Sequence, residues 1–193
     1  AGGLWVAAAT GLVWLYVWAG TNRAMSLPLA VETSGALALL VANLAFSLGQ
    51  MEAARIGWSA FLVLTIAGER RELTRLMKLP GWASRAFLLV WSGALAALVL
   101  ALWRPDWGAS LWWITMALLA AWLLRWDVAT RQWRAQGWAG HTANCLVAGY
   151  VWLAAASVLG LLGQPVAWHA LWLGFVMAMV FGHAPILLPA LAG

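Results

Sequence analysis

The chain has 193 residues, of which 65% are hydrophobic and only 9% are charged, and its mean hydropathy is +0.85. A soluble domain has about 25% charged residues, so this chain has too few polar side chains to coat a globule. Its net charge of +5 does not require a nucleic acid partner, because basic residues gather in the cytoplasmic loops of membrane proteins. We predict an all-α polytopic membrane protein, a transmembrane helical bundle in a lipid bilayer, with no nucleic acid partner.

The apolar residues fall into seven segments, each near the length of about 20 residues that a helix needs to cross a bilayer. The predicted spans are residues 1–20, 29–49, 52–68, 84–103, 109–125, 141–162 and 168–190. The third is the weakest, because Arg55 lies in its first turn. No soluble linker interrupts the series, so we expect a single transmembrane domain over residues 1–193.

The distribution of basic residues tests this number of spans. With seven spans, nine of the 11 basic residues lie in loops on one side, and only Arg55 and Arg104 lie on the other. Without the third span the division weakens to eight against three. Because basic loops stay in the cytoplasm, we expect a bacterial inner-membrane protein whose first residue here is periplasmic and whose last is cytoplasmic. Because the sequence starts AGGLW, without an initiator Met, we expect it to be part of a longer chain.

Two polar stretches are predicted to be helix ends. GERRELTRLMKLPGWASR (residues 68–85) is expected to project into the cytosol as a solvated helix end. In LRWDVATRQWR (residues 124–134), Asp127 lies between Arg125 and Arg131, so local ion pairs are expected.

Three further polar residues lie inside apolar spans. A carboxylate such as Glu32 has to be paired, protonated or in contact with water, and Arg23 or a basic group of residues 69–85 is its expected partner. Asn43 lies further along the same segment, and Asn144 is expected to hydrogen-bond across helices.

The last span contains two histidines, His169 and His183. On a regular α-helix their separation is about 40° short of four turns, so both are expected on one face, about 21 Å apart along the axis. Neutral imidazole is a common metal ligand and the usual axial ligand of haem iron. This pattern favours haem or metal binding by these two residues.

Each histidine has a possible opposite ligand and an ordinary alternative role. His141 is expected to approach His183, whereas Met116, or a helix outside this sequence, is expected to face His169. Alternatively, His169 is an interfacial residue, and His183 bonds a backbone carbonyl that is freed by Pro185. Prolines remove amide donors, so we expect a kinked, partly unwound helix end.

The opposite face of the last span has small residues at four-residue spacing, Gly174, Ala178 and Gly182. Such a stripe lets a second helix approach closely. We therefore expect one face of this span to pack tightly against another helix.

Three stretches, HALWLGFVMAMVFGHAPILLPAL (residues 169–191), LTIAGERRELTRL (64–76) and CLVAGYVWLAAASVLGLL (145–162), resemble the NnrS-like family of bacterial membrane proteins. The most specific piece is HAxxLGF, which starts at His169. That family is linked to the nitric-oxide response and is described as containing haem and copper. The resemblance implies that His169 and His183 are ligands of haem or a metal, with copper as a further candidate.

The predicted function is haem or metal binding in respiratory or nitric-oxide metabolism, and whether the protein is an enzyme stays open. A first alternative is a proton- or solute-coupled transporter, in which Glu32, Asn43, Asn144 and His183 line a polar path. A second alternative is a non-catalytic subunit that docks through its small-residue stripe. The expected partners are other membrane subunits or a part of the same chain beyond this sequence.

Overall fold

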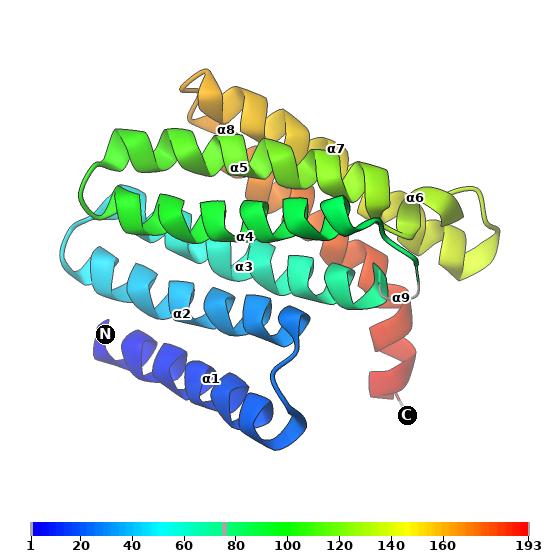
Figure 1. Cartoon of the computed structure of the whole chain (residues 1–193), viewed down its shortest axis with the longest axis horizontal. Coiled ribbons are helices and arrows are strands. Elements are labelled where there is room, and N and C mark those ends of the chain that lie inside the picture. The colour runs from blue at the N-terminus through cyan, green and yellow to red at the C-terminus, as the bar shows by residue number, and fades with distance from the viewer. Residues whose placement is uncertain (1, 75–76, 193) are drawn as a thin grey trace. The chain divides into compact units, whose positions relative to one another are not determined.

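The structure, a computed structural model, describes residues 2–74 and 77–192, and it leaves the side chains of residues 2, 23 and 186–192 outside the description. The described residues form helices and contain no strand, as predicted. The long helices are α1 (Gly2–Arg23), α2 (Leu27–Ser47), α3 (Met51–Leu73), α4 (Gly81–Ala101), α5 (Pro105–Trp126) and α7 (Gly137–Leu161). A short α6 (Ala129–Gln132) precedes α7, and the last segment is formed by α8 (Val166–His169), the π-helix η2 (Ala170–Val176) and α9 (Met177–Ala192) (Figure 1).

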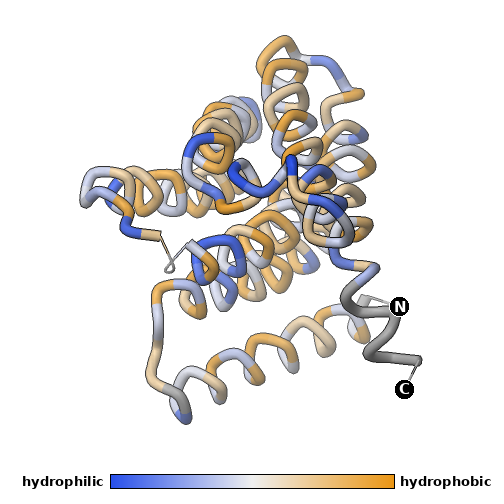
Figure 2. The backbone as a smooth tube through the Cα atoms, turned by 90° about the vertical axis from the view of Figure 1, so that its right-hand side faces the viewer, coloured by the Kyte–Doolittle hydropathy of each residue, from blue (hydrophilic) through white to orange (hydrophobic). Residues whose placement is uncertain are grey.

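Among the described residues, six helical segments are long and apolar enough to cross a membrane: Gly3–Asn22, Leu27–Ser47, Gly81–Ala101, Pro105–Trp126, Gly137–Leu161 and Val166–Pro185. Figure 2 places the most hydrophilic positions at helix ends and in loops. Each segment corresponds to a predicted span, and the fold is that of an all-α polytopic membrane protein. The third predicted span corresponds to α3, which is not in this set because charged residues lie near both its ends.

The chain folds into two compact units. Unit 1 consists of Ala1–Glu72 and Leu88–Thr115, and unit 2 consists of Leu73–Phe87 and Met116–Gly193. Both α4 and α5 therefore contribute residues to each unit. The prediction of a single domain is not tested by this division.

In unit 1, α3 packs antiparallel along α2 through glycines that permit close approach. A Cβ at Gly57 would lie 2.7 Å from the Cβ of Ala42, and a Cβ at Gly35 would lie 3.2 Å from the carbonyl oxygen of Phe61. Further along, a Cβ at Gly68 would lie 3.0 Å from the carbonyl oxygen of Pro28. Because these contacts extend from the start of α2 to its last two turns, α3 accompanies α2 over most of its length (Figure 1).

The turn between these helices is closed by a glycine with a left-handed backbone. Gly49 has φ +77°, its amide donates to the carbonyl of Phe46, and the amide of Gln50 donates to the carbonyl of Ala45. This pair of bonds is the Schellman motif. The same sequence, Leu-Gly-Gln, closes α7 at residues 162–164, where Gly163 has φ +69°.

In unit 2, the predicted small-residue stripe is in contact with α7, which confirms the expected close helix packing. A Cβ at Gly174 would lie 2.7 Å from the Trp152 ring, and a Cβ at Gly182 would lie 3.2 Å from the Cβ of Cys145. Between them, Ala178 lies against Gly149 of α7, and a Cβ added at Gly149 would lie 3.2 Å from the Cβ of Ala178. The stripe is therefore occupied within the chain, and it does not offer the docking surface of the subunit hypothesis.

Each of the two polar stretches contains a charged residue that is buried. Arg70, within residues 68–85, is only 5% exposed, although its neighbours Glu69 and Glu72 are exposed. Asp127 is fully buried, and its Oδ1 accepts a hydrogen bond from the amide of Ala129 at 2.7 Å. The carboxylate of Asp127 thus stabilises the turn into α6, because it satisfies a backbone donor at the helix start.

Candidate functional site

A pocket of about 750 Å³ lies within unit 1, bordered by α1, α2 and α3. The residues that line it are Trp5, Ala8, Ala9 and Leu12 of α1, Leu39, Asn43, Phe46 and Ser47 of α2, and Trp58 of α3. Only Asn43 and Ser47 are polar. This size and this lining are typical of small-molecule sites, which enclose about 300–1,000 Å³ and have few polar groups.

The side chain of Asn43 joins the three helices around the pocket. Its Nδ2 donates to the carbonyl oxygen of Trp5 at 3.1 Å, and its Oδ1 accepts from the indole Nε1 of Trp58 at 2.9 Å. A carboxamide has two N–H donors and two acceptor lone pairs. One donor and one lone pair of Asn43 therefore remain for a polar group of a ligand.

Close backbone packing positions Trp58 at the pocket. Gly57 directly precedes it, and a Cβ there would lie 2.9 Å from the carbonyl oxygen of Ala38, so only glycine permits this separation of α2 and α3. The Trp58 ring packs against Phe46 with ring centroids 5.4 Å apart. The indole N–H is thereby held toward Asn43.

The pocket lies near one end of the spans that form it. Asn43 is four residues before Ser47, the last residue of α2, which corresponds to about 6 Å of helix rise. Trp5 is in the first turn of α1, and Trp58 is in the second turn of α3. Helix α1 is the most exposed candidate span, with 11% of its apolar window buried, so a membrane component can reach the pocket beside it.

Glu32 lies at the opposite end of α2, against α3. A Cβ at Gly68 would lie 2.6 Å from Cγ of Glu32, so the glycine makes room for this side chain. Among the side chains that the structure describes, none forms an ion pair with Glu32. The predicted pair with Arg23 falls on a side chain outside the description.

His169 and His183 do not share the predicted face. The prediction assumed a regular α-helix, but the intervening residues Ala170–Val176 form a π-helix. Its i→i+5 bonds place an additional residue in a turn, which shifts every later side chain by about 100°. His169 is exposed, whereas His183 is partly buried.

The backbone partner of His183 also differs from the prediction. Its Nδ1 donates to the carbonyl oxygen of Met179 at 2.7 Å, one turn earlier on the same helix, rather than to a carbonyl freed by Pro185. Helix α9 continues through Pro185 and Pro189 to Ala192, so the predicted unwinding at the prolines is absent. The irregular part of the segment is instead the π-helix upstream.

The proposed opposite ligands lie in different surroundings. Met116 is fully buried in the core, whereas His141 is exposed at the start of α7. The Nε2 of His141 lies 3.6 Å from Sγ of Cys145, and no hydrogen bond joins it to His183.

These residues do not fit a haem held between His141 and His183. At the level of His183, helices α7 and α9 are in contact, since a Cβ at Gly182 would lie 3.4 Å from the carbonyl oxygen of Thr142. That contact leaves no gap for a porphyrin. Among the described residues, no three His, Cys, Asp or Glu side chains are grouped as a metal site requires. Haem and copper binding stay predictions that rest on the resemblance.

The cross-helix hydrogen bond expected of Asn144 is made by a neighbouring residue. Asn144 is exposed, and it has no partner among the described side chains. Thr142 Oγ1 donates to the carbonyl oxygen of Gly182 at 2.8 Å, which joins α7 to α9. The side chain of Asn144 therefore lies on the exposed surface of unit 2 rather than between α7 and α9.

The sequence matches a family described as a domain of unknown function (DUF8744) over residues 1–193. The chain belongs to this family. No curated protein and no solved structure matches it. The DUF8744 assignment carries no activity and does not test the NnrS-like resemblance, so the functional argument rests on the geometry of the site.

Sequence reasoning identified Asn43 but missed its partners in this DUF8744 chain. Nothing in the sequence distinguishes Trp5 and Trp58 from the other tryptophans, because tryptophan is common in membrane spans as an interfacial anchor. Their spacing along the chain gives no sign that both meet Asn43. One usable signal is Gly57 beside Trp58, because small residues mark close helix contacts.

Proposed function

We propose that this protein binds a lipophilic molecule of the bilayer in the α1–α2–α3 pocket. The observation that carries the proposal is an apolar pocket of about 750 Å³ whose lining includes the Asn43 carboxamide. An apolar lining favours a hydrocarbon ligand, and the remaining donor and acceptor of Asn43 favour a ligand with one polar group. A long-chain fatty acid or an isoprenoid alcohol has this combination.

Filling the pocket from α1 tests the proposal. Ala8 lines the pocket and the adjacent Ala7 does not, although both residues are exposed. We expect Ala8→Phe to lower the binding of tritiated palmitic acid and tritiated geranylgeraniol to the immobilised, detergent-solubilised protein severalfold. Ala7→Phe, the matched control, should leave binding unchanged because its ring projects away from the cavity.

The outcome that contradicts the proposal is equal binding by the native protein and by Ala8→Phe. Equal loss in both variants contradicts it as well, since the effect would then follow from altered α1 rather than from the pocket. Monodisperse elution of each variant in size-exclusion chromatography verifies that the fold is retained.

We also propose a bacterial inner-membrane orientation with the first residue of this sequence in the periplasm and the last in the cytoplasm. Its support is that α3 accompanies α2 over most of its length, since counting α3 as a span brings nine of the 11 basic residues to one side. Membrane-impermeant maleimide labelling of intact cells tests this topology. In a Cys145→Ser background, Arg104→Cys should be labelled and Arg134→Cys should not, and the reverse pattern contradicts the proposed orientation.

A further inference from the structure

We propose that one end of unit 2 binds the headgroups of anionic phospholipids. The site, here called the basic collar, consists of Lys78, Arg85, Arg125, Arg131 and Arg134, all of which are exposed. It lies where α4 begins, α5 ends and α7 begins. The inference is independent of the pocket in unit 1.

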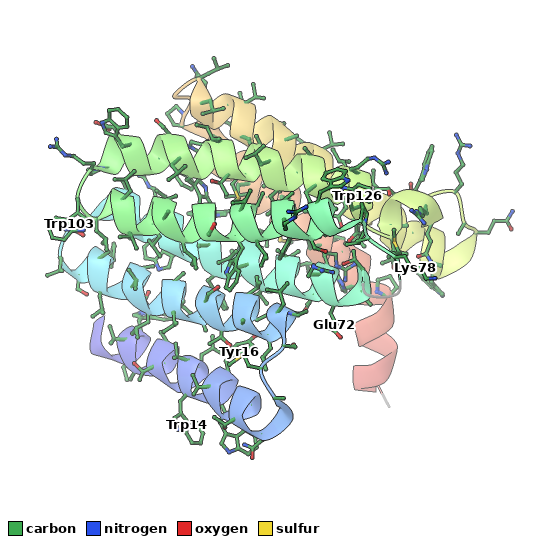
Figure 3. All side chains as sticks on the ribbon, viewed as in Figure 1. Trp14, Tyr16, Glu72, Lys78, Trp103 and Trp126 are labelled. Carbon is green, nitrogen blue, oxygen red and sulfur yellow. The ribbon has the colours of Figure 1, made fainter. Side chains whose placement is uncertain are left out.

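Packing brings these segments together at one end of the spans. Trp82, in the first turn of α4, meets Trp126, the last residue of α5, in an edge-to-face contact with ring centroids 5.3 Å apart. Lys78 and Trp126 are drawn at this same end of unit 2 (Figure 3). Because α5 and α7 are apolar enough to cross a membrane, residues 127–136 between them lie at the level of the lipid headgroups.

The exposed charge of unit 2 is exclusively positive. Asp127 is the only acidic residue in the sequence of this unit, and it is fully buried. No collar residue forms an ion pair with any side chain that the structure describes. An anion at this surface therefore meets no exposed carboxylate of the same unit.

Two of the arginines are stacked on tryptophan rings. The Cζ of Arg125 lies 4.3 Å from the ring centroid of Trp126, and the Cζ of Arg134 lies 4.7 Å from that of Trp133. Tryptophan favours the membrane–water interface, and a stacked guanidinium keeps its in-plane N–H donors directed outward. Those donors match two oxygens of a phosphate.

The position of the collar favours phosphate that is part of a lipid. The flanking spans keep the site beside the headgroups, where anionic lipids attract each nearby Lys or Arg. Trp82, Trp133 and Trp138 are exposed beside the collar, and their rings can contact the glycerol and upper acyl region. A soluble phosphate gains nothing from these rings.

Lipid retention measured by native mass spectrometry tests the proposal. The complete chain in a non-ionic detergent is mixed with phosphatidylglycerol or with phosphatidylcholine of the same acyl composition. We expect the native protein to retain phosphatidylglycerol at least about tenfold more strongly than phosphatidylcholine. Arg125→Gln/Arg134→Gln should lose most of this preference, whereas Arg125→Lys/Arg134→Lys should keep part of it because the charge remains.

Arg104→Gln is the matched control, because Arg104 is also exposed and lies between the exposed Trp103 and Trp107, but at the α4–α5 turn in unit 1. It should retain the full preference. The proposal is overturned if the native protein holds both lipids equally, or if Arg104→Gln loses as much as the double variant. Displacement of phosphatidylglycerol by millimolar inorganic phosphate would overturn the assignment to a lipid.

Discussion

The indole Nε1 of Trp58 on α3 donates a hydrogen bond of 2.9 Å to the carboxamide oxygen of Asn43 on α2. Both residues also line the pocket. The contact that joins the two helices therefore also fixes the polar group that a ligand meets. Binding and stability are coupled at this point of unit 1.

The first prediction concerns Asn43→Ala. It removes two hydrogen bonds between helices, to Trp58 and to the carbonyl of Trp5. We expect the free energy of unfolding to fall by about 1 kcal/mol, since such bonds average about 0.6 kcal/mol each within membranes. Denaturation with sodium dodecyl sulfate in mixed micelles measures the change. Asn144→Ala, at an exposed residue without a described partner, should change stability much less, and equal effects would contradict the bridging role of Asn43.

A second prediction concerns the α2–α3 contact at Gly57. An alanine there would place its Cβ 2.7 Å from the Cβ of Ala42 and 2.9 Å from the carbonyl oxygen of Ala38. Backbone atoms cannot yield as a flexible side chain can, so Gly57→Ala should cost about 1–3 kcal/mol of stability. The melting temperature in detergent reports this loss.

Gly11→Ala is the control for that substitution. Nothing lies within 4 Å of a Cβ at Gly11, and alanine is a better helix former than glycine by about 0.5–1 kcal/mol. We expect its melting temperature to rise or stay the same. Equal melting temperatures of the Gly57→Ala and Gly11→Ala variants would contradict the close approach of α2 and α3 at Gly57.

The third prediction concerns the junction of α7 and α9. Thr142→Val keeps the shape of the side chain but removes the bond from Oγ1 to the carbonyl oxygen of Gly182. The expected loss is about 0.6–1.5 kcal/mol. Thr10→Val should have little effect on packing between helices, because Thr10 Oγ1 bonds the carbonyl of Val6 on its own helix. Unfolding in the same mixed micelles measures the stability of both variants. A larger loss of stability for Thr10→Val than for Thr142→Val would contradict the hydrogen bond between α7 and α9.

The NnrS-like resemblance makes a fourth prediction, which optical spectra of the oxidised and dithionite-reduced protein test. It predicts a Soret band with reduced α and β peaks that His183→Ala removes, together with iron in metal analysis of the same sample. A protein free of haem and metal, shown to have lost no cofactor during purification, contradicts that function. It leaves the pocket and the basic collar unaffected.

Hydropathy was sufficient to predict the six most apolar spans, because each of them places a long apolar stretch in the bilayer, whereas the span that corresponds to α3 also needed the distribution of basic residues. Ser26 and Pro28 also indicate where α2 begins, since Ser26 caps the helix and accepts the amide of Leu29. The π-helix from Ala170 to Val176 was missed, because the phase argument assumed regular α-helical bonding throughout. For this reason the sequence placed His169 and His183 on one face and the structure does not.

The candidate site was only partly predictable. A polar residue inside an apolar span marks Asn43 as unusual, but its two partners belong to helices that only the tertiary packing brings together. Asn144 carries the same signal and has no described partner, whereas Thr142, two positions earlier, makes the bond between helices. Polarity within a span thus indicates that a contact is needed, and packing decides which residue makes it.

The most direct test of the central claim is to map the covalent attachment of a photoactivatable palmitic acid to the native protein in lipid nanodiscs. Mass spectrometry of the proteolysed protein should locate the label in the pocket-lining parts of α1 and α2, residues 5–12 and 39–47, and excess unlabelled palmitic acid should abolish it. Labels spread over the lipid-exposed faces of all helices, without competition by unlabelled palmitic acid, would contradict a specific ligand site in unit 1.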